Sequence, residues 1–79
     1  MQKLIYKEYQ ITASAFQDDN GKWIGQASIV PLSDESPIRI DDPMIFDNET
    51  FDEEKNAEDF AMDGAQFFLD DFLQNSASQ

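Results

Sequence analysis

Carboxylates are the side chains with which this chain could do chemistry: it has 17 among 79 residues, against five lysines and arginines. Paired carboxylates can serve as acid and base on a glycosidic bond, but only in a cleft that removes one of them from water. Histidine and cysteine are absent, which excludes thiol nucleophiles, disulfides, zinc fingers and the usual general base. The serines have no histidine to activate them. We therefore expect no catalytic residues and no enzyme.

Four aspartates share one face of the helix that the sequence predicts from about residue 52. At 100° per residue, the side chains of Asp52, Asp59, Asp63 and Asp70 fall within about 40° of one another. The stripe runs about 27 Å at the helical rise, long enough to imitate several phosphates of a nucleic-acid strand. Asp70 and Asp71 lie toward the negative end of the helix dipole, so helix stability does not explain them. We expect these five aspartates to bind a partner; the alternative is a solvated helix face.

The net charge of -12 comes entirely from one part of the chain. Residues 1–33 carry three acids and three bases, whereas residues 34–79 carry 14 acids against Arg39 and Lys55. Such a field repels nucleic acid and favours a basic partner. We expect a protein partner, with no direct contact to nucleic acid.

The acids away from the helix do not match a metal site. An EF-hand loop starting at Asp18 would need a bidentate glutamate at its twelfth position, which here is Ile29. The residues Asp41, Asp42, Asp47 and Glu49 have the spacing of no known metal cage. We expect neither a metal nor another cofactor.

Periodicity predicts the elements that carry these side chains. Residues 4–16 and 23–30 alternate as strands around the turn at residues 18–21, where Asn20-Gly21 tolerates positive φ. Residues 33–37 read as a polar loop, and residues 38–46 as a further strand, bent or split at Pro43. The prediction is one α+β domain over residues 1–74, with a frayed polar tail at 75–79. Its fold is a three- or four-stranded antiparallel sheet (β-β-β-α) with one C-terminal helix packed on one face.

The apolar side of that helix is an arc formed by Ala57, Phe60, Ala61, Gly64, Ala65, Phe68 and Phe72. Gly64 on this arc indicates a close approach of the helix backbone to the sheet. Two N-caps compete: Thr50, which forms a capping box with Glu53, and Asp52, which would leave Phe51 extended under the helix.

Both margins of this arc carry additional apolar side chains. Phe67 lies at one margin, and Met62, Leu69 and Leu73 lie beyond the other. One small sheet cannot bury both margins, so a homodimer through this helix or a sheet edge is an open expectation.

Packing positions give the chain a resemblance to a class of short bacterial domains of unknown function, built as a strand meander and one helix. The residues are Tyr6, Tyr9, Ile11, Gly21, Trp23, Phe51, Ala57, Ala61, Ala65 and the run Phe68-Leu69-Asp70. The chain is also similar, more weakly, to HicB-type antitoxin domains, through Thr50 and Glu53. It departs from them where Lys55 and Asn56 precede Ala57, and where the segment at 31–34 lacks a glycine. The first resemblance implies only the fold, and the second implies neutralisation of a basic toxin.

These observations predict a non-enzymatic protein-interaction domain whose acidic helix face docks on a basic partner, as a nucleic-acid mimic or an antitoxin-like neutraliser. A structural homodimer and a small-ligand-binding domain are the alternatives. The chain shows neither a secretory leader nor a run of about 18 apolar residues. We therefore expect a cytoplasmic protein without membrane contact.

Overall fold

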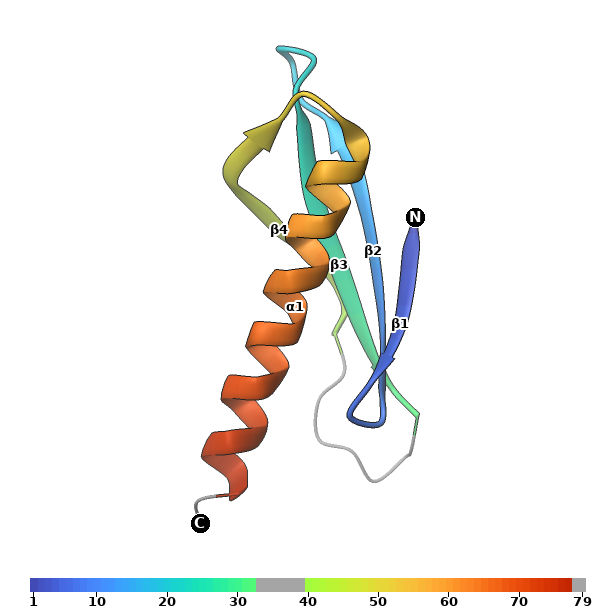
Figure 1. Cartoon of the computed structure of the whole chain (residues 1–79), viewed down its shortest axis with the longest axis vertical. Coiled ribbons are helices and arrows are strands. Elements are labelled where there is room, and N and C mark those ends of the chain that lie inside the picture. The colour runs from blue at the N-terminus through green and yellow to red at the C-terminus, as the bar shows by residue number, and fades with distance from the viewer. Residues whose placement is uncertain (33–39, 78–79) are drawn as a thin grey trace.

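Four strands and one helix follow one another in the computed structural model, which describes residues 1–32 and 40–77 (Figure 1). In chain order they are β1 (Gln2–Tyr6), β2 (Tyr9–Gln17), β3 (Trp23–Pro31), β4 (Ile40–Phe51) and α1 (Glu54–Ala77). Each strand pairs antiparallel with the next, in the order β1-β2-β3-β4, and α1 packs on one face of the sheet. The α+β fold predicted from the sequence is confirmed, with four strands. No helix in the described ranges has the length and apolar character needed to cross a membrane.

The additional strand arises because the predicted first strand is two strands. A two-residue turn at Lys7 and Glu8 separates β1 from β2, and Tyr6 pairs with Tyr9 across it. Both turn residues have positive φ, 50° for Lys7 and 71° for Glu8. Tight hairpins of this kind normally use asparagine and glycine at these positions, so the sequence carries no signal for the turn.

The strand around Pro43 is continuous from Ile40 to Phe51, so it is not split there. Its pairing with β3 shifts register twice, so that Phe46 pairs with Gly25 and Phe51 with Trp23. The predicted loop at 33–37, and the first two residues of the predicted strand at 38–46, lie outside the described residues.

The core lies between α1 and the sheet face that bears Tyr9, Ile11, Ala13, Ala27 and Ile29. From α1 it takes Ala57, Ala61, Met62, Ala65 and Leu69.

The buried side of α1 is rotated by roughly 60° from the predicted arc. Leu69 is fully buried, whereas Phe68 is 38% and Phe67 75% exposed. Tyr6, from the unforeseen strand β1, packs against the same core as Leu69 and Leu73, and its hydroxyl donates to Asp70, the residue after Leu69.

At Gly25 of β3, the backbone of α1 comes very close to the sheet. A Cβ at Gly25 would overlap the carbonyl oxygen of Ala57 and lie 2.9 Å from the Cβ of Ala61. The sequence predicts this approach at Gly64, but there it is the ring of Phe46 that fills the space, 2.5 Å from the position of an added Cβ. Glycine is therefore required on the strand so that the helix alanines can rest on it.

The helix starts later and ends later than predicted. Thr50 and Phe51 belong to β4 and α1 begins at Glu54, so Thr50 does not cap the helix. Phe51 stays extended with its ring 5.4 Å from that of Phe60, as the alternative with Asp52 predicts, but Asp52 lies two residues before α1 and binds Lys22, so it does not cap the helix either. At the other end α1 continues to Ala77, three residues into the predicted tail; residues 78 and 79 lie outside the described range.

Substitutions to alanine in α1 test its rotation. Leu69→Ala should lower the free energy of unfolding by about 2–5 kcal/mol, because it empties a fully buried site. Phe67→Ala should change it by no more than about 0.5 kcal/mol, because the ring is exposed. Urea unfolding followed by circular dichroism measures both, and a larger loss for Phe67→Ala would contradict this packing.

Substituting alanine for each of two glycines tests the close contact between helix and strand. Gly25→Ala should cost about 1–3 kcal/mol, since the new Cβ meets helix backbone. The matched control, Gly64→Ala, should cost less, because the Phe46 ring can shift and alanine gains about 1 kcal/mol of helix propensity. The same unfolding measurement applies, and the reverse order would place the close approach elsewhere.

Candidate interaction surface

The five aspartates predicted to bind a partner fall into two groups in the structure. Asp52, Asp59 and Asp70 bind lysines of the same chain. Asp63 and Asp71 are exposed, and neither forms a hydrogen bond or ion pair with another described residue. Asp52 precedes α1 and is not part of the helical face.

Asp70 joins α1 to the turn between β1 and β2. Its Oδ1 accepts hydrogen bonds from Lys7 Nζ at 2.6 Å and from Tyr6 Oη at 2.7 Å. The bond from Lys7, and then that from Tyr6, hold the pKa of Asp70 below its ordinary value. Lys7 Nζ also lies 5.4 Å from the centre of the Tyr6 ring, within the range of a cation–π interaction. Asp70 therefore has structural partners, Tyr6 and Lys7, that the sequence did not predict.

The turn that Asp70 contacts is conformationally costly. Residues other than glycine adopt positive φ at a cost of order 1–3 kcal/mol each, and Lys7 and Glu8 both do so. The bond from Lys7 to Asp70 and a hydrogen bond from the Leu32 amide to the Glu8 carbonyl, at 3.0 Å, hold this turn from two sides.

The helix dipole disfavours Asp70 and Asp71 less than the sequence predicts. Because α1 continues to Ala77, both aspartates lie more than one turn before its end. The dipole effect falls off within the last turn, so the expected penalty at these positions is small.

Asp59 contacts β1 at the other end of that strand. Its Oδ1 accepts a hydrogen bond from Gln2 Nε2 at 2.7 Å, and its Oδ2 pairs with Lys55 at 3.1 Å. These bonds, first that from Gln2, hold the pKa of Asp59 below its ordinary value. The neighbouring Glu58 is only 6% exposed and accepts a hydrogen bond from the terminal amine of Met1 at 2.8 Å. These acids therefore fasten α1 along β1.

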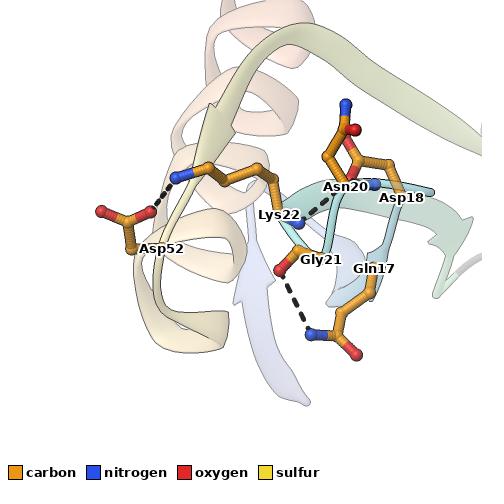
Figure 2. A network of polar contacts seen from close by, with 6 residues as sticks. All are labelled: Gln17, Asp18, Asn20, Gly21, Lys22 and Asp52. Carbon is orange, nitrogen blue, oxygen red and sulfur yellow. Dashed lines mark hydrogen bonds and ion pairs between the residues drawn. The ribbon is translucent and has the colours of Figure 1, made fainter.

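Asp52 is held by Lys22, which follows the turn between β2 and β3 (Figure 2). That turn is organised by Asp18, whose Oδ1 accepts the amides of Asn20 at 2.8 Å and Lys22 at 2.9 Å. Gly21 supplies the positive φ, 80°, that the sequence predicts in this turn. The Lys22 side chain then extends to Asp52, just before α1, and lowers the pKa of that carboxyl through their hydrogen bond.

Asp63 and Asp71 form the outward ridge of α1 together with Phe67. The three residues follow one another at intervals of four, which places them in a row along one side of a helix. All three are exposed. The ridge therefore presents an aromatic ring between two carboxylates.

Of the three lysine–aspartate ion pairs among the described residues, only one could be anticipated from spacing. Lys55 precedes Asp59 by four residues, the distance at which helix side chains meet. Lys7 and Lys22 reach Asp70 and Asp52 only through the tertiary fold, and each lies in a hairpin turn far away in sequence. Helical periodicity alone therefore groups aspartates that differ in the folded chain, because some bind a lysine and others do not.

The described residues offer neither a metal site nor a cavity. Within 1–32 and 40–77, no group of three or more acidic residues is arranged to hold a metal ion. No pocket is present in the same part of the chain, so the alternative of a small-ligand domain finds no cavity there.

Asp70→Asn should make stability less dependent on acid pH. Since the folded-state pKa of Asp70 is lowered from 3.8, its carboxylate stabilises the fold above that value, and this contribution is lost as pH falls through the lower, folded-state value. The wild type should therefore exceed Asp70→Asn in unfolding free energy between about pH 5 and about pH 9, and this difference should shrink as pH falls below 3.8 and vanish below the folded-state pKa of Asp70. Urea titrations across pH measure it.

The matched control is Asp63→Asn, which removes the same charge from a carboxylate without a described partner. Its difference from wild type should be small at every pH. A pH profile of Asp70→Asn indistinguishable from that of Asp63→Asn would show that the contacts of Asp70 with Tyr6 and Lys7 do not stabilise the fold.

Comparison of the chain with protein-family models, with curated proteins and with solved structures finds no match.

Proposed function

We propose that the protein is a non-enzymatic interaction domain whose acidic helix face docks on a basic surface of another protein. The observation that carries the proposal is the ridge of Asp63, Phe67 and Asp71. Its two carboxylates have no described partner, and its ring is 75% exposed. Exposure of an aromatic ring to water is unfavourable, so burying it against a partner stabilises the complex. The carboxylates on either side of the ring favour a partner with positive charges.

The ridge defines the partner by its chemistry. Asp63 and Asp71 are eight residues apart, which corresponds to about 12 Å along a helix. A complementary surface has an apolar depression for Phe67, flanked by lysine or arginine side chains at about that spacing. Nucleic-acid-binding grooves and basic toxins both present such cations, since they contact phosphates that repeat at short intervals.

The three aspartates that bind lysines contribute less to this docking than Asp63 and Asp71 do. Asp52, Asp59 and Asp70 are each already paired with a lysine, which offsets much of their field. A partner's cation would have to displace that lysine or share the carboxylate with it. We therefore assign the larger part of the binding energy to Asp63 and Asp71, while Asp59 and Asp70 extend the acidic surface along the β1 side of α1 and Asp52 extends it just before the helix.

Pairs of charge-removing substitutions test the proposal by capture from the native host on immobilised protein. Asp63→Asn with Asp71→Asn should reduce the affinity for the captured partner about tenfold, or about 1.4 kcal/mol. Asp47→Asn with Glu49→Gln removes the same charge from exposed positions on β4 and should leave the affinity nearly unchanged. Equal losses from the two pairs would mean that only net charge matters, and no loss from either would refute docking through the ridge.

Changing the salt concentration and removing the Phe67 ring separate the electrostatic and the apolar contributions to binding. Raising salt from about 0.1 M to about 1 M shortens the Debye length from ~10 Å to ~3 Å and should release the partner. Phe67→Ala should weaken binding at every salt concentration without changing the salt dependence, because it removes apolar contact only. A salt dependence that disappears with Phe67→Ala would contradict this division.

A further inference from the structure

Strand β1 contributes little to the buried core. None of its five residues is buried, and its apolar side chains Leu4 and Ile5 are 37% and 59% exposed. The buried cluster beneath α1 is made instead by residues of β2, β3 and α1, with Tyr6 only partly buried against it. Because β1 lies at an edge of the sheet, it can leave while that cluster keeps all its members.

The turn between β1 and β2 opposes the closed hairpin. Lys7 and Glu8 have φ values of 50° and 71°, a region that favours glycine and disfavours other side chains. The segment Tyr6-Lys7-Glu8-Tyr9 contains none of the residues that hairpin turns normally use. Opening the turn relieves this strain, since both residues then return to negative φ. Short hinges under strain favour the exchange of an element between copies.

The contacts that hold β1 are ones that a second copy offers in identical form. β1 pairs with β2 over its whole length. Gln2 donates to Asp59 of α1 at 2.7 Å. Tyr6 donates to Asp70 of α1, also at 2.7 Å. The β1 strand of another copy carries the same side chains in the same order, so it can form each of these bonds in the same register. Once β1 has left, the edge of β2 is therefore complementary to the β1 strand of a second copy.

We propose that two copies of this chain exchange β1: the turn at Lys7 and Glu8 opens, and each β1 pairs with β2 of the other copy. The bonds of β1 to β2 and α1 are kept, now between copies, and the strain of two turns is relieved. The ion pair between Lys7 and Asp70 favours the closed turn, and the repulsion between copies that each carry -12 opposes the dimer. The dimer therefore depends on concentration, and it forms slowly because β1 must first detach.

Cysteine pairs placed across neighbouring strands test the exchange, because the chain has no cysteine of its own. Lys3 and Thr12 are partners across β1 and β2, and Thr12 and Ser28 are partners across β2 and β3. Paired Cα atoms of antiparallel strands lie about 4.5–5.5 Å apart, within the range that a disulfide spans. The test variant is Lys3→Cys with Thr12→Cys. The matched control is Thr12→Cys with Ser28→Cys, whose two strands stay in one copy.

Each variant is equilibrated at roughly 1 µM and at roughly 1 mM, a range that brackets weak association, and is then oxidised. Denaturing electrophoresis without reductant measures the share of disulfide-linked dimer. This share should rise with concentration in the test variant, while the control stays a monomer. A dimer through any other surface keeps each disulfide within its own chain and runs as a monomer. A share that does not rise with concentration, or a control linked to the same extent, overturns the proposal.

Three substitutions of Glu8 test whether the turn drives the exchange. All remove the same charge, and Glu8→Gln, which keeps an unbranched side chain at positive φ, is the reference. Glu8→Gly accepts positive φ and should lower the association constant about tenfold from that reference. Glu8→Val is β-branched, disfavours positive φ and should raise it about tenfold.

Sedimentation velocity measures the three association constants, and circular dichroism checks that each variant folds. If Glu8→Val does not fold, the comparison of Glu8→Gly with Glu8→Gln carries the test alone. A constant for Glu8→Gly that equals or exceeds that of Glu8→Gln overturns the proposal, because the strained turn would then not drive the exchange.

Discussion

Because Gly25 has no side chain, Ala57 and Ala61 rest directly on β3, and this contact fixes how α1 is rotated about its axis. The rotation decides which helix residues reach the sheet and which face water. With it set, Leu69 is buried, Asp59 and Asp70 lie within reach of β1, and Phe67 is turned outward. A side chain at position 25 would force the helix to lift or turn, and the hydrogen bonds along β1 would be lost with it.

The turn between β1 and β2 is a second constraint on the fold, and it depends on the contact between α1 and Gly25. Lys7 and Glu8 adopt a backbone conformation that their own side chains disfavour. The turn gains support because Asp70 lies where Lys7 and Tyr6 can both donate to it. In return, the bonded turn ties the distal half of α1 to the sheet, where the helix projects away from the strands in Figure 1. The Asp70 carboxylate thus links the strained turn between β1 and β2 to the position of α1.

Local pattern was sufficient to predict the fold class, the turn at Gly21 and the existence of the helix, since each follows from period or from a residue with special backbone freedom. The turn at Lys7 could not be predicted, because its residues lack the usual signal and only the tertiary contact with Asp70 supports them. The rotation of α1 could not be predicted either. The predicted arc already contained Ala57 and Ala61, which rest on Gly25, but it placed Leu69 outside and Phe68 inside, whereas Leu69 is buried and Phe68 is 38% exposed. The predicted acidic stripe likewise combined aspartates that bind lysines with aspartates that do not, because helical periodicity does not show these tertiary contacts.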